Sequence, residues 1–157
     1  MRRPAIRFMT AEALIFVDTN VLVYARDHSA GAKHATAVLW LNRLANAERM
    51  LLNMQVLNEL TRWMLRKERS STAIARDAIE MLREFGEAPL LDDDVERAWD
   101  VRETLGYQWF DCLLIASAAK AGCSHFLSED MGHETRYGSL TIINPFRVDP
   151  DSFLSKN

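Results

Sequence analysis

Four acidic residues, spread over most of the chain, stand where an α/β sheet could gather their side chains. They are Asp18, Glu59, Asp111 and Asp130. Carboxylates that converge without enough Lys or Arg among them repel one another, and hard cations such as Mg²⁺ or Mn²⁺, bound through oxygen atoms, relieve that repulsion. The set therefore suggests a site for one or two divalent metal ions, with phosphodiester hydrolysis as its chemistry.

The elements that must position these acids are strands and helices in alternation. The pattern predicts strands over 13–17, 50–53, 90–91, 125–128 and 140–143, and helices over 19–26, 32–47, 55–68, 71–85, 93–105 and 111–121. The first strand is continuously apolar, as a strand covered on both faces requires. The alternation favours a three-layer α/β/α sandwich with a short, mostly parallel central sheet and a site at the carboxyl ends of its strands.

Two of the acids fall on one rim of such a sheet. Asp18 closes the first strand and Asp130 follows the fourth, while Glu59 and Asp111 lie in the first turns of helices whose amino ends face the same rim. Taken singly, helix capping or turn formation explains Asp111 and Asp130 better than catalysis does. The joint placement of all four is what favours a shared site.

Further polar residues lie near these positions. Asn20, two residues after Asp18, could orient a carboxylate through its amide, although a role in the turn explains it equally well. Arg62 and Arg66 fall three and seven residues after Glu59, and Lys67 continues the positive charge. This stripe could lead an RNA backbone toward the metals, or it could be an ordinary solvated helix face.

Three adjacent acids, Asp92, Asp93 and Asp94, resemble metal ligands but precede a helix, so capping and the helix dipole explain them. We expect Asp93 and Glu96 to form a capping box, and the three acids are left out of the site.

There is no GxSxG, GxGxxG or P-loop motif, which argues against serine hydrolases, dinucleotide binding and nucleotide-triphosphate binding. A phosphoryl-accepting receiver or an aspartate phosphatase would need a second Asp near Asp18, and Thr19 and Asn20 do not supply one.

Length and composition indicate the number of domains and the compartment of the protein. A chain of 157 residues with 48% hydrophobic content fits one domain, which we expect at 13–147, between an N-terminal leader or arm at 1–12 and a C-terminal tail at 148–157. The net charge of −3 does not mark a nucleic-acid binder. Two cysteines without a Cys/His cluster fit a reducing compartment, and the sequence shows neither a signal peptide nor a membrane span. We therefore expect a cytoplasmic protein with no membrane partner.

At these residues the chain resembles the PIN domain, specifically the VapC-type toxin ribonucleases of bacterial and archaeal type II toxin–antitoxin pairs. The resemblance spans most of 14–146. Its most specific segments are 16–24, 110–116, 126–131 and 143–146. The stretch 131–134 departs from the glycine placement expected after the final acid.

This resemblance implies a Mg²⁺- or Mn²⁺-dependent endoribonuclease in which Asp18, Glu59, Asp111 and Asp130 form an acidic quartet. Ser128 matches a small hydroxyl residue near that quartet, and Asn20 matches its supporting amide. The family is commonly dimeric and is neutralised by an antitoxin encoded alongside. An alternative from another class is a catalytically inactive PIN-like module that binds RNA or a protein, against which the four intact acids count.

Overall fold

The computed structural model describes residues 12–157, so the expected leader at 1–12 lies outside the described residues except for Glu12. Its sheet has six strands in the order β3-β2-β1-β4-β6-β5. The strands are β1 (Ile15–Val17), β2 (Met50–Asn53), β3 (Glu87–Ala88), β4 (His125–Leu127), β5 (Arg136–Tyr137) and β6 (Leu140–Ile143). All neighbours pair in parallel except β5, which is antiparallel to β6 at the edge.

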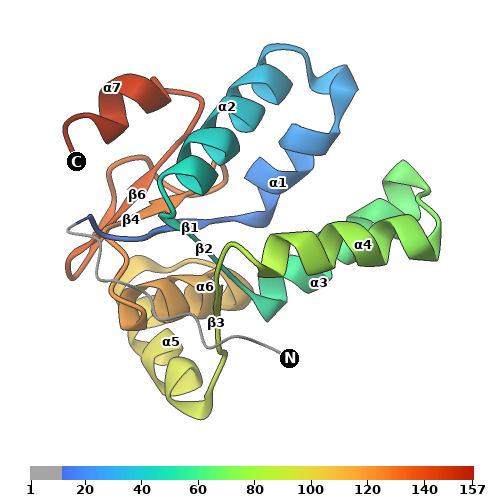
Figure 1. Cartoon of the computed structure of the whole chain (residues 1–157). Helices are drawn as coiled ribbons and strands as arrows, with labels where there is room; N and C mark the ends of the chain where they lie inside the picture. The colour runs from blue at the N-terminus through green and yellow to red at the C-terminus, as the bar shows by residue number, and fades with distance from the viewer. Residues whose placement is uncertain (1–11) are drawn as a thin grey trace.

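Helices cover both faces of this sheet. They are α1 (Thr19–Arg26), the 3₁₀ turn η1 (His28–Ala30), α2 (Ala32–Asn46), α3 (Met54–Trp63), the π-helical turn η2 (Met64–Glu68), α4 (Thr72–Arg83), α5 (Asp92–Leu105), α6 (Trp109–Lys120) and α7 (Pro150–Leu154). Figure 1 shows α1, α2 and α7 on one side of the sheet, α5 and α6 on the other, and α3 with α4 projecting as a hairpin. The expected three-layer α/β/α sandwich with a mostly parallel sheet is confirmed.

The strand register determines which residues meet at the carboxyl rim. Val17 at the end of β1 lies opposite Leu127 at the end of β4, so the residues that follow them, Asp18 and Ser128, emerge side by side. All three residues of β1 are fully buried, which agrees with the uninterrupted apolar run in the sequence.

The third strand was expected at 90–91, and that prediction is wrong. The strand is β3, where Glu87 and Ala88 pair with Leu52 and Asn53 of β2. Leu90 and Leu91 are exposed, and Leu91 is the residue that precedes α5. A two-residue strand is too short to show a periodic pattern, so the sequence favours the apolar pair Leu90 and Leu91 instead.

The capping acid of α5 also differs from the expectation. The carboxylate of Asp94, not Asp93, accepts the backbone N–H of Leu91 at 2.7 Å, and Asp94 is fully buried. Asp93 instead accepts a hydrogen bond from Lys120 of α6. The N-cap is Leu91 and not Asp93, two residues earlier than predicted, which moves the third position of the first turn from Glu96 to Asp94.

The segment expected as a C-terminal tail contains α7. Its Phe153 ring packs against the buried Trp40 of α2, with ring centroids 5.6 Å apart. The indole N–H of Trp40 donates to the carbonyl of Pro145 at 2.8 Å. These contacts join the end of the described chain to the layer formed by α1 and α2.

No helix within 12–157 is long and apolar enough to cross a membrane.

Candidate active site

Asp18 is at the centre of the carboxyl rim, between β1 and α1. It is the N-cap of α1, and its carboxylate accepts hydrogen bonds from the Thr19 backbone N–H at 2.7 Å and from the Ser128 hydroxyl at 2.7 Å. Only 5% of the residue is exposed. The pKa of Asp18 is raised to about 7: burial is the largest cause, the hydrogen bonds from Ser128 and Thr19 oppose it, and the charges of Asp111 and Glu59 add to it.

Asn20 and Ser128 connect Asp18 to Asp130. The Asn20 amide nitrogen lies 3.2 Å from Asp18 Oδ2 and 3.1 Å from Asp130 Oδ2, and its amide oxygen accepts the Glu129 backbone N–H at 3.3 Å. The Ser128 hydroxyl oxygen accepts the Asp130 backbone N–H at 3.2 Å. The structure therefore places both supporting residues between two acids that are far apart in the sequence.

Glu59 on α3 is held at the same rim by two residues that the sequence analysis did not select. The Thr19 hydroxyl donates to Glu59 Oε2 at 2.6 Å, and the Gln55 amide lies 3.3 Å from Glu59 Oε1. Gln55 also donates to the Phe110 carbonyl at 3.1 Å, which joins α3 to α6. Two signals were available, because Thr19 follows Asp18 directly and Gln55 precedes Glu59 by one helical turn.

Asp111 lies in the first turn of α6 and is half-buried. Its side chain does not cap the helix, and it accepts no hydrogen bond from residues 12–157. Burial raises the pKa of Asp111, and the charges of Asp130 and Glu59 raise it further. The charges of Asp111 and Glu59 likewise raise the pKa of Asp18. The four acids are therefore close enough to interact electrostatically.

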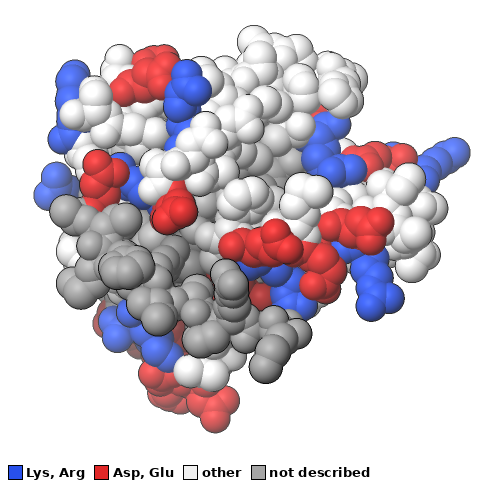
Figure 2. Space-filling view, in the orientation of Figure 1, with Lys and Arg blue, Asp and Glu red and all other residues white. Residues whose placement is uncertain are grey.

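Positive charge does not balance this cluster. Within 12–157, none of the four acids forms an ion pair with Lys or Arg. Glu129, the neighbour of Asp130, is paired with Lys33 of α2 and is therefore neutralised separately. Figure 2 shows acidic and basic side chains interspersed over one face of the molecule.

The donor chemistry fits a hard divalent ion that keeps part of its water shell. In the described part of the chain, no three Asp, Glu, His or Cys side chains form a ready-made set of metal ligands. Mg²⁺ usually retains several waters and takes only one or two protein carboxylates, so it does not need a closed cage. Carboxylates that repel one another and lack cationic partners are suitable ligands for such an ion.

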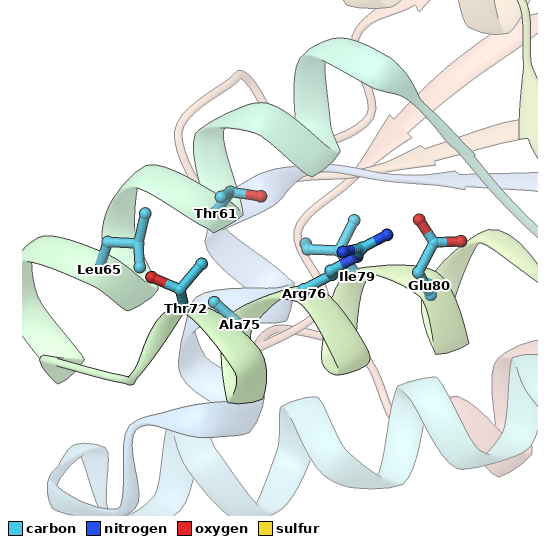
Figure 3. A pocket seen from close by; sticks show the side chains of 7 residues that line it. All are labelled: Thr61, Leu65, Thr72, Ala75, Arg76, Ile79 and Glu80. Carbon is cyan, nitrogen blue, oxygen red and sulfur yellow. The ribbon is translucent and has the colours of Figure 1, made fainter.

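Two cavities flank α3. One, of about 530 Å³, begins at Glu59 and is lined further by Arg62, Trp63, Arg66 and Lys67. The other, of about 310 Å³, lies between α3 and α4 (Figure 3) and is lined by Thr61, Leu65, Thr72, Ala75, Arg76, Ile79 and Glu80. Only the first cavity includes a member of the acidic cluster.

Comparison with known proteins gives one family and a common fold. The PIN domain model matches residues 15–136. Among solved structures, VapC20 of Mycobacterium tuberculosis, described as a toxin that cleaves the sarcin–ricin loop, is 25% identical with a TM-score of 0.53 and covers 71% of this chain and 86% of its own. VapBC2 of Rickettsia felis, bound to a DNA fragment from its promoter, is 15% identical with a TM-score of 0.59 and covers 82% and 96%. No protein of curated function matches the chain.

Proposed function

Since the chain belongs to the PIN domain family, with VapC-type toxins among its structural neighbours, we propose that it is a Mg²⁺- or Mn²⁺-dependent endoribonuclease and the toxin of a toxin–antitoxin pair. The observation that carries this proposal is the electrostatic coupling of Asp18 and Asp111 with the other acids at one rim, without an ion pair to relieve it. Such an arrangement is unfavourable unless a cation binds there.

Each residue has a defined role in the proposed site. Asp18, Asp111 and Asp130 would hold one or two ions, and Glu59 would serve as a further ligand or position the attacking water. Asn20 and Ser128 fix the directions of the Asp18 and Asp130 carboxylates through the hydrogen bonds described above. When bound, a divalent ion supplies activation of water and neutralisation of charge on the phosphate.

Substitution of Asp111 gives the sharpest test. Asp111 accepts no hydrogen bond within 12–157, so Asp111→Asn should leave the fold intact. We expect the wild-type protein to cleave RNA in Mg²⁺ or Mn²⁺ and not in EDTA, and Asp111→Asn to be at least 100-fold slower, the order seen when a catalytic electrostatic group is removed. The exposed Asp92→Asn is the matched control and should retain full activity.

Two results would contradict this proposal. Cleavage that continues in EDTA would exclude the metal requirement. RNA binding without cleavage under any of these conditions, and without stabilisation of the fold by Mn²⁺, would favour the inactive PIN-like module instead.

The partners are proposed on separate grounds. A cognate antitoxin is supported by the likeness to VapBC2, and exposed apolar side chains on α4, Ile74 and Met81, offer it a surface. A homodimer is supported by Phe110 and Met54, which are exposed apolar residues beside the acids. We place the protein in the cytoplasm with its RNA substrate. Co-expression with the product of the adjacent gene, followed by light scattering of each species, tests both assemblies.

A further inference from the structure

The cavity that begins at Glu59 has the size and composition of a nucleotide site. Its volume of about 530 Å³ lies within the usual range of about 300–1,000 Å³ for small-molecule sites. One wall carries an indole ring, and the remaining lining residues past Glu59 are cationic. All of them come from α3 and η2, so a single continuous helix presents the whole wall.

The three cations of this cavity are available to a ligand. Arg62, Arg66 and Lys67 are exposed and form no ion pair within 12–157. The acid nearest to them in sequence, Glu68, is already neutralised, because Arg26 of α1 donates to it at 2.7 and 2.8 Å. The pairing removes the obvious competitor for the cations and leaves them to bind an anion such as phosphate.

The backbone beneath the cavity departs from a regular helix. The sequence predicts one helix over 55–68, but α3 ends at Trp63 and continues as the π-helical turn η2. This turn ends at Glu68 and is capped by Arg69, whose φ is left-handed at 57°. The fully buried Met64 anchors this turn in the core. Irregular turns of this kind occur often at functional sites, and here the turn places Arg66 and Lys67 beside the indole ring.

Trp63 is a suitable platform for a base. It is half-buried and packs against the hydrophobic core, so its ring is held rather than free, while it still lines the cavity. An aromatic face binds any base that is not already stacked in a duplex. Glu59, one turn before Trp63 on α3, lines the same cavity, and its carboxylate accepts the Thr19 hydroxyl at the acidic cluster.

We propose that this cavity binds one unpaired nucleotide of the RNA next to the bond that is cut, with its base stacked on Trp63 and its phosphate held by Arg62, Arg66 and Lys67. The proposal rests on the proposed function, since it assigns the cavity to the same substrate. It also adds a preference, because a duplex keeps its bases stacked and cannot offer a free face to the indole.

The test measures RNA binding without metal, so that it does not depend on cleavage. The probe is a short fluorescein-labelled single-stranded RNA in EDTA, followed by anisotropy, and the same sequence as a duplex is the comparison. We expect Trp63→Leu to weaken single-strand binding by about tenfold and Trp63→Phe to restore most of it. Trp99→Leu, an exposed tryptophan on α5, is the matched control and should have no effect.

The cationic part of the site has its own readout. Arg66→Gln should reduce the slope of log Kd against log salt concentration by about 0.7, the value for one phosphate contact with a single strand. Arg136→Gln, on the edge strand β5 at the other end of the sheet, should leave that slope unchanged. Equal slopes for the wild type and Arg66→Gln would remove Arg66 from the site.

Fluorescence keeps the test valid if Trp63→Leu unfolds. Unlabelled RNA should quench tryptophan emission in the wild type and not in Trp63→Phe. Unchanged binding by a folded Trp63→Leu variant, emission quenched by RNA in Trp63→Phe as strongly as in the wild type, or equally tight binding of the duplex overturns the assignment of this cavity. Metal-dependent cleavage that survives those results leaves the proposed function standing, whereas binding through Trp63 with no cleavage overturns the proposed function alone.

Discussion

Asp18→Asn is expected to stabilise the metal-free protein while it abolishes activity. The pKa of Asp18 rises from its ordinary value of 3.8 to about 7, chiefly because the side chain is buried. A folded-state pKa above the unfolded value means that the folded protein binds the proton more tightly. The stability that protonation of Asp18 contributes is therefore fully present below about pH 4 and is lost as the pH rises to about 7 and above.

The size of the effect follows from that difference. At about 1.4 kcal/mol per pKa unit, the interval between 3.8 and about 7 corresponds to about 4 kcal/mol lost at pH 8. Asn carries no charge and escapes this loss, but its amide nitrogen cannot accept the hydrogen bonds that Asp18 Oδ2 receives from Ser128 and Asn20. Those bonds offset about 2 kcal/mol, so the net gain at pH 8 is about 2 kcal/mol.

The assay is unfolding by heat and by urea in EDTA at pH 5 and pH 8. We expect Asp18→Asn to melt about 4–8 °C above the wild type at pH 8, and to differ little from it at pH 5. Saturating Mn²⁺ should stabilise the wild type and not the variant. Asp77→Asn, an exposed acid on α4, controls for loss of charge alone. A variant less stable than the wild type at pH 8, with an unchanged pH profile, would refute the reasoning.

Three further predictions concern the supports of the site. Asn20→Ala should weaken Mn²⁺ binding by about tenfold in calorimetry, because it frees two carboxylates, while Asn58→Ala on α3 should not. The Arg26 hydrogen bonds hold the pKa of Glu68 below its ordinary value of 4.5, so their stabilisation is present above that pH and is lost as the pH falls through the lowered value. Arg26→Met should therefore cost about 0.5–1 kcal/mol at pH 7 and nothing at low pH in urea unfolding. Phe153→Ala should cost about 2 kcal/mol in the same assay, since its ring packs on Trp40; no change would mean that α7 is dispensable.

Much of the fold and the rim could be predicted because the signals are local. The apolar run before Asp18 fixes a buried strand, and parallel pairing then brings the ends of β1 and β4 together. The π-helical turn could not be predicted, because its residues continue the helical pattern and only the packing of Met64 and the Arg26 pair distinguish it. The two-residue strands β3 and β5 are too short to show a period.

The sequence does not show which of several neighbouring acids belongs to the site, because that depends on contacts between distant segments. Glu129 and Asp130 are equivalent as sequence, yet Lys33 of α2 neutralises the first and leaves the second to Asn20. Asp94 is more deeply buried than Asp111, but its carboxylate accepts a backbone N–H, which is a structural role. Asp111 accepts no hydrogen bond within 12–157 and lies among like charges. A partly buried carboxylate without a hydrogen bond and among like charges destabilises the fold. We therefore expect Asp111 to be there for the ligand that it binds.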